Sequence, residues 1–180
     1  TGLAIQCYDS NVDGSTPTAP DEQTFLKFGN MLLRMGGEIG YHGYNHQPLC
    51  LDDCDYNGLY DYKTWESEAA MKTALDTLME LCEDLFPGVQ ISLYVPPSNM
   101  LSEGAEEFLI REYPNIKSIS GIYFDGMDVD FYCTQEFDVR EDGVVEQPRI
   151  ISGCDVDDYS KLAALSELNL HYINSHFTHP

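Results

Sequence analysis

Short apolar runs alternate with longer segments of helical periodicity along most of the chain. Apolar residues at helical spacing predict helices over residues 21–35, 64–86 and 102–112, and a further helix capped by Asp157 or Asp158. Short apolar runs predict strands over residues 3–8, 38–41, 89–95, 116–123, 149–152 and 171–175. Residues 124–148 are less regular and favour a β-ribbon. Because strands and helices alternate, we expect an α/β fold built on a parallel sheet or barrel.

A long loop after the second predicted strand carries the most distinctive pattern. Residues 42–62 are rich in Asp, Tyr and Cys, and loops of this length in compact domains are usually functional or disordered. The loop opens with His42 and His46, at the place where α/β barrels carry their chemistry. Glycines and a proline around the pair argue against one helical turn, but a loop can still direct both imidazoles at one ion. We expect the pair to bind a divalent metal, with zinc as the first candidate and a carboxylate as third ligand.

The same loop leaves other interpretations open. The spacing of His42, His46, Cys50 and Cys54 would permit a closed structural zinc site, and a disulfide between the two cysteines is equally open. Residues 53–58 copy the first half of a calcium loop, but the Glu of its twelfth position is missing. The simpler alternatives are that the two histidines bind no ligand and that residues 53–58 form only a solvated acidic loop.

Three further residues fall at the predicted catalytic edge of the barrel. His176 could act as a general acid because the pKa of an imidazole lies near neutrality. Asp9 ends the first predicted strand and could be a ligand or a base, or only a turn residue. Asp155 could orient a base or belong to a helix cap. The 12 tyrosines and Trp65 fit stacking on sugars, although many will be core residues.

Charge narrows the possible partners. The chain holds 31 acidic and 9 basic residues, a formal net charge of -22, so nucleic acid and anionic membrane surfaces are unfavourable partners. A cationic or neutral polar substrate fits this charge better. No apolar run is long enough to cross a bilayer, and we find no nucleophile elbow, P-loop or dinucleotide fingerprint. The chain begins without Met and shows no signal peptide, so we expect a fragment of a longer precursor.

Residues 37–49, Gly-Glu-Ile-Gly-Tyr-His-Gly-Tyr-Asn-His-Gln-Pro-Leu, resemble the second motif of the NodB-like polysaccharide deacetylases, carbohydrate esterase family four. The resemblance implies a distorted, incomplete (β/α) barrel and a zinc-like metal held by Asp-His-His, with His42 and His46 as the two histidine ligands. Residues 93–97 resemble the strand that carries Arg-x-Pro, with Tyr94 where Arg is usual. The resemblance implies substrate contacts at the following residues: Tyr44, Tyr94, Pro96 and His179.

Later motifs follow in the expected order. Residues 155–159 resemble a shortened Asp-x-Asp…Asp-Trp motif, and residues 173–176 resemble the final strand, whose histidine protonates the leaving amine. That role would fall to His176, with His179 as substitute. The first motif, a strand ending in paired Asp, has no counterpart, so we expect the base and the carboxylate ligand upstream of residue 1. Gly43 stands where the family has Ser or Thr.

The sequence therefore predicts one deacetylase-like domain over residues 1–180. We expect metal-dependent removal of N- or O-acetyl groups from a cell-wall or extracellular polysaccharide, outside the cell or at its surface. One alternative is a non-catalytic carbohydrate-binding or structural module derived from the same fold. Another is a structural metal domain that depends on Cys50 and Cys54.

Overall fold

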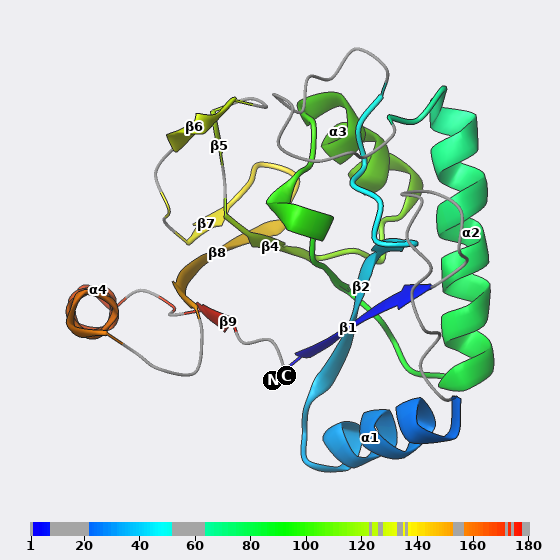
Figure 1. The fold of residues 1–180 in the computed structure, drawn as a ribbon, viewed down its shortest axis with the longest axis horizontal. Helices are drawn as coiled ribbons and strands as arrows, with labels where there is room; N and C mark the ends of the chain where they lie inside the picture. The colour runs from blue at the N-terminus through cyan, green and yellow to red at the C-terminus, as the bar shows by residue number, and fades with distance from the viewer. Residues whose placement is uncertain are drawn as a thin grey trace.

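A computed structural model describes residues 2–7, 22–51, 64–122, 124–125, 128–132, 135, 137–152, 157–171, 173 and 175–177. Figure 1 shows the order of the elements along the chain. The helices are α1 (Glu22–Arg34), α2 (Glu68–Leu85), the short 3-10 helix η1 (Pro97–Asn99), α3 (Glu103–Glu112) and α4 (Asp158–Asn169). The strands are β1 (Gly2–Cys7), β2 (Glu38–Tyr44), β3 (Leu93–Tyr94), β4 (Ser118–Gly121), β5 (Phe124–Asp125), β6 (Asp128–Tyr132), β7 (Asp138–Val139), β8 (Val145–Ser152) and β9 (Ser175–Phe177).

The main sheet has the strand order β1-β2-β3-β4-β8-β7, and β9 also pairs with β8. Neighbouring strands from β1 to β8 run parallel, as do β8 and β9, whereas β7 is antiparallel to β8. The sheet curls, with β1 at one edge and β9 near the other (Figure 1). The predicted fold class is thus confirmed as an α/β half-barrel, an incomplete (β/α) barrel. Strands β5 and β6 form a separate antiparallel ribbon within the irregular region.

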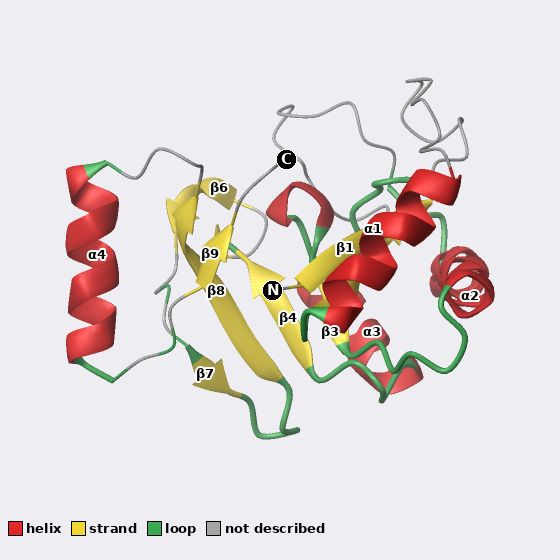
Figure 2. Cartoon of the chain, turned by 90° about the horizontal axis from the view of Figure 1, so that it is seen from below, coloured by secondary structure: helices red, strands yellow, loops and turns green. Residues whose placement is uncertain are grey.

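The register divides the sheet residues between two faces. Tyr41, Tyr94 and Ile119 lie level on neighbouring strands, are buried, and pack in one core with residues of α2 and α3. We call this the outer face, because the helices cover it (Figure 2). Side chains alternate along a strand, so the next residues point the other way. That inner face carries Gly40, Leu93, Ser118 and Val145 in one row across β2, β3, β4 and β8.

Side-chain caps explain where the longer helices begin. Ser102 Oγ accepts a hydrogen bond from Ala105 N at the start of α3, and Asp157 Oδ1 accepts one from Ser160 N at the start of α4. Asp157 is one of the two residues predicted as the cap of α4, and α3 begins one residue after its predicted start at position 102. Helix α2 begins later than predicted, because Ser67 Oγ caps it by accepting from Ala70 N.

Two strand boundaries differ from the prediction in ways that move candidate residues. β2 continues to Tyr44, which pairs with Cys7 of β1, so His42 lies inside a strand and not in the loop beyond it. Pairing with β1 overrides the low strand propensity of the glycines in this segment. β9 spans Ser175–Phe177, so His176 also lies within a strand.

Helix α4 stands apart from α1, α2 and α3 (Figure 2). None of its residues is buried, and Leu162, Leu165 and Leu168 are exposed. Among the described residues, no helix has the length and apolar character needed to span a membrane.

Candidate functional site

His42 is fixed in orientation by the neighbouring strand. Its Nδ1 lies 2.8 Å from the carbonyl oxygen of Val95, directly after β3. Val95 is itself held, because its amide nitrogen donates to the carbonyl oxygen of Tyr41 at 2.8 Å. A carbonyl can only accept, so the neutral His42 ring carries its proton on Nδ1 and its lone pair on Nε2. This bond from one ring nitrogen to a backbone carbonyl is the usual arrangement for a histidine whose other nitrogen binds a metal.

The ring of His46 lies beside that of His42. Their centroids are 4.9 Å apart and their planes meet at 72°. His46 reaches this position through a tight turn, in which Gln47 N donates to the carbonyl oxygen of Tyr44 at 3.0 Å. Two imidazoles this close can supply two ligands to one cation, and they can also pack edge to face without one. This geometry agrees with the expectation from the sequence that the two rings lie close together.

Gly43 allows the two chain segments to meet. Its φ is +72°, and a Cβ at this position would lie 2.6 Å from Pro97 Cγ and 3.0 Å from the carbonyl oxygen of Gln47. A side chain is therefore excluded both by backbone conformation and by space. This explains why glycine stands where the deacetylase motif has Ser or Thr.

Left-handed backbone is concentrated in two loops at this edge of the sheet. Asn45 and His46 have φ values of 53° and 56°, in the loop after β2. Ser98 and Asn99 have φ values of 51° and 59°, in η1 after β3. Each such residue costs about 1–2 kcal/mol, and backbone strain of this kind gathers at functional sites. Asn99 also connects η1 to the segment after β4, because its Oδ1 accepts a hydrogen bond from Ile122 N at 3.1 Å.

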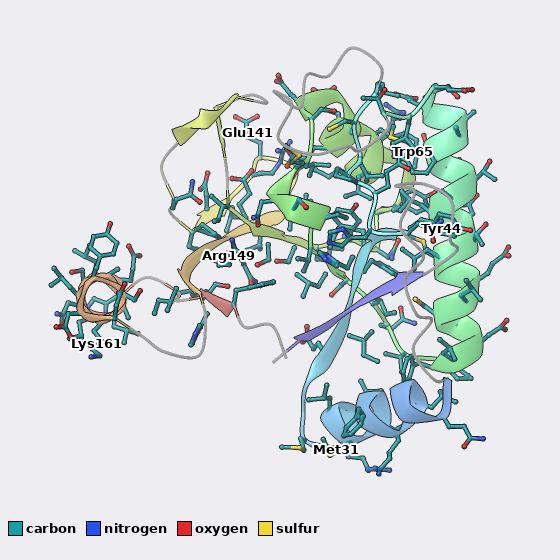
Figure 3. All side chains as sticks on the ribbon, in the orientation of Figure 1. Met31, Tyr44, Trp65, Glu141, Arg149 and Lys161 are labelled. Carbon is teal, nitrogen blue, oxygen red and sulfur yellow. The ribbon has the colours of Figure 1, made fainter. Side chains whose placement is uncertain are left out.

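Arg149, which sequence reasoning missed, lies on the inner face together with His42. Gln147 pairs level with Ser120 of β4, and Arg149 follows it by two positions on β8. The guanidinium is half-buried, with its Cζ 4.5 Å from the centroid of the Phe177 ring. Its Nε is buried and finds no acceptor among the residues that the structure describes. Burial lowers the pKa of this guanidinium. Figure 3 shows Arg149 beside β8, on the side toward β1 and β2.

Two tyrosines predicted to bind substrate contact the helix-covered core instead. Tyr94 is 1% exposed on the outer face, within the core under the helices, where burial raises the pKa of its hydroxyl. It cannot reach the inner face, so it is withdrawn from the set of candidates. Tyr44 is half-buried, packs against the same core and lies toward α2 (Figure 3). Pro96 is buried close to Gly121, where a Cβ would be 3.6 Å from its Cδ.

His176 lies on β9 with its side chain exposed. Its neighbour Phe177 contacts Arg149, and adjacent residues of a strand point to opposite faces. His176 therefore points away from the inner face, in contrast to the position expected of a proton donor to substrate. Asp9, Asp155 and His179 lie outside the described residues, as do Cys54 and residues 53–58.

The described part of the chain brings together two imidazoles, those of His42 and His46, that could act as donors to a metal. Within it, no group of three His, Cys, Asp or Glu side chains is arranged to hold a metal. Cys50, proposed for a structural zinc site, is fully buried in the described structure. Of the predicted ligand set, the described residues include the imidazole pair, and no carboxylate joins it among them.

Comparison with known proteins places the chain as follows. The model of a family described as "Uncharacterised protein conserved in bacteria (DUF2194)" matches residues 1–180. No curated protein matches the chain. Among solved structures, a crystal structure described as a "putative polysaccharide deacetylase from Mycobacterium smegmatis" matches with a TM-score of 0.49 and 18% identity. That match covers 87% of this chain and 53% of the other protein, so the chain spans about half of its length.

Proposed function

This chain belongs to the bacterial family DUF2194, and we propose that it forms the metal site of a carbohydrate deacetylase. The reaction would remove N- or O-acetyl groups from a cell-wall or extracellular polysaccharide, outside the cell or at its surface. Two imidazoles and a carboxylate form one of the common catalytic zinc sites. The deacetylase assignment rests on the motif in residues 37–49.

The observation that carries the proposal is the pair formed by His42 and His46. The rings are 4.9 Å apart at the C-terminal edge of a parallel half-barrel, the edge on which barrel enzymes place their active sites. The bond from His42 Nδ1 to Val95 directs the lone pair to Nε2. The left-handed backbone at His46 also favours a functional position, because strain of this kind gathers at such sites.

Each candidate residue would have a separate role in the reaction. His42 and His46 would hold the metal, and Val95 would keep the His42 ring in its ligating orientation. A bound zinc ion supplies Lewis acidity toward an acetyl carbonyl and lowers the pKa of a bound water. Asp9 is the candidate base in this sequence. Because His176 points away from the inner face, His179 becomes the candidate proton donor to the leaving group.

Acetate release from acetylated oligosaccharides tests the proposal. The longest natural protein that contains these residues should release acetate when loaded with zinc and lose this activity with a chelator. His42→Ala and His46→Ala should each reduce the rate by at least about 100-fold, whereas His171→Asn, at an exposed histidine, should leave it unchanged. Release that survives the chelator and both alanine variants would rule out the proposal.

A non-catalytic carbohydrate-binding module is the second candidate. This candidate is favoured by Tyr94, which stands where the polysaccharide deacetylase motif has arginine and lies buried on the outer face. Sugar binding without acetate release, unaffected by chelator and by His42→Ala, would support the module over the enzyme.

A further inference from the structure

Arg149 is a half-buried cation without an acidic partner among the described residues. Desolvation lowers its pKa, and no carboxylate of the described residues offsets that effect. Its Nε is buried and has no acceptor in the described part of the chain. A charge removed from water without a counter-ion destabilises a fold, so such a group is a candidate for binding an anion from outside the chain.

Arg140 is the comparison for Arg149, because it is also half-buried but has carboxylates around its guanidinium. Its Nη1 contacts Glu106 at 2.7 Å and Glu146 at 3.5 Å, and its Nε contacts Asp142 at 3.2 Å. That cluster lies on the outer face, where α3 supplies Glu106. With 31 acidic residues against 9 basic ones, the chain has ample carboxylates for its cations. Arg149 on the inner face is left without one in the described structure.

The contact with Phe177 determines how a ligand could approach Arg149. The Phe177 ring lies 4.5 Å from the guanidinium carbon, and Nε is buried, so the terminal Nη groups are the part left for a ligand. Two parallel N–H groups in one plane match the two oxygens of a carboxylate. We infer that Arg149 binds a carboxylate carried by the polysaccharide substrate, so that the substrate is an acetylated polysaccharide containing uronic acid units.

This inference rests on the proposed function, because it takes His42 and Arg149 to contact one ligand. Both lie on the inner face, and β3 and β4 separate β2 from β8. Three strand spacings amount to about 14 Å along the sheet, and the curl of the sheet shortens the direct path. A unit whose acetyl group reached His42 would therefore place a neighbouring unit, and not its own ring, beside Arg149.

An acidic substrate differs from what net charge alone suggests. The charge of -22 favours neutral or cationic ligands at long range. At physiological ionic strength, however, exposed charges are screened beyond about 8 Å, whereas a half-buried cation next to the ligand is screened far less. The local charge of Arg149 can thus determine specificity at its subsite while the surface as a whole stays acidic.

Calorimetry with two matched ligands tests the inference. The ligands are a partially acetylated oligouronide and the same preparation after carboxyl reduction, which is neutral and has equal length and acetylation. The zinc-loaded natural protein that contains this chain should bind the acidic ligand at least about tenfold more tightly. Arg149→Gln should remove this preference, and Arg149→Lys should retain part of it. Equal binding of both ligands, binding of neither, or an unchanged preference in Arg149→Gln would overturn the inference.

Controls separate failure of this inference from failure of the proposed function. The preference is measured by binding, so it can be read again in the presence of a chelator and in His42→Ala, where no acetate is released. A preference that persists there and depends on Arg149 supports the carboxylate subsite even if the protein is not a deacetylase. Acetate release from a neutral oligosaccharide at the same rate as from the acidic one would keep the deacetylase and overturn the subsite.

Discussion

The Nδ1 atom of His42 lies 2.8 Å from the carbonyl oxygen of Val95, so a residue of β2 is oriented by the backbone that follows β3. Parallel pairing puts these segments side by side, although 53 positions separate them in the sequence. The orientation of the proposed metal ligand is therefore a product of the sheet and does not depend on the loop alone.

The tautomer of His42 is directly measurable. We expect the neutral ring to be protonated at Nδ1, because the Val95 carbonyl can only accept a hydrogen bond. Nitrogen NMR of the side-chain imidazoles of the metal-free protein distinguishes the two tautomers. Exposed His171 serves as a reference in the same spectrum. A His42 ring protonated at Nε2 would contradict the structure at this point.

The space beside Gly43 predicts a large effect of a small substitution. Gly43→Ala forces both a left-handed alanine and a Cβ 2.6 Å from Pro97. Gly36→Ala is the matched control, because Gly36 has φ +83° and a Cβ added there would meet no atom within 4 Å. We expect Gly36→Ala to lower the free energy of unfolding by about 1–2 kcal/mol and Gly43→Ala by roughly 1–3 kcal/mol more. Urea unfolding measures both, and equal losses would show that Pro97 and the Gln47 carbonyl move aside freely.

The two half-buried arginines should respond in opposite directions to the same substitution. Arg149→Met removes an unpaired charge while keeping an apolar stem against Phe177, so we expect stability to rise by about 1 kcal/mol. Arg140→Met leaves Glu106 and Glu146 close together and partly buried without their cation, so we expect a loss of about 1–3 kcal/mol. Chemical unfolding of both variants near neutral pH provides the comparison. A loss in Arg149→Met as large as that in Arg140→Met would mean that Arg149 supports the fold.

Buried tyrosines predict how stability falls at alkaline pH. Burial, with smaller effects from Cys82 and Glu83, raises the pKa of Tyr41 from 10.0 to about 12. In the unfolded chain the phenol loses its proton near pH 10, whereas the folded state retains it to about pH 12. The contribution of Tyr41 is thus complete below pH ~10 and is lost as pH rises through that interval.

Tyr41→Phe tests this contribution. Unfolding free energies measured at a series of alkaline pH values should fall less steeply for the variant than for the parent chain. Tyr159→Phe is the control, because Tyr159 is 79% exposed. Identical slopes for Tyr41→Phe and the parent would show that the Tyr41 hydroxyl ionises as readily in the folded state as in the unfolded one.

The helices and the parallel arrangement of the strands could be predicted from sequence because their signals are local. Ser102 and Asp157 lie directly before apolar-periodic segments, and their side chains satisfy amide groups within the same turn. The alternation of helices with strands then restricts the topology to a parallel sheet. The close approach of His42 and His46 was also predictable, since only a short loop separates them.

The face on which a strand residue lies was harder to predict. In residues 89–95, apolar residues are nearly continuous, so alternation does not show whether Tyr94 points to the helices or to the inner face. A shift of one residue moves every side chain of a strand to the opposite face of the sheet. The register set by the neighbouring strands decides which face each side chain occupies. The same register puts Arg149 on the inner face. From sequence, Arg149 is one arginine after a proline and resembles any exposed cation of an edge strand.

X-ray absorption spectroscopy of the zinc-loaded protein shows whether both imidazoles bind the metal, because it reports the atoms bound to zinc. We expect two imidazole nitrogens at about 2.0–2.1 Å from zinc, with one lost in His42→Ala, one lost in His46→Ala and both kept in His171→Asn. Zinc bound without imidazole, or a spectrum that neither alanine variant changes, would show that His42 and His46 do not form the metal site.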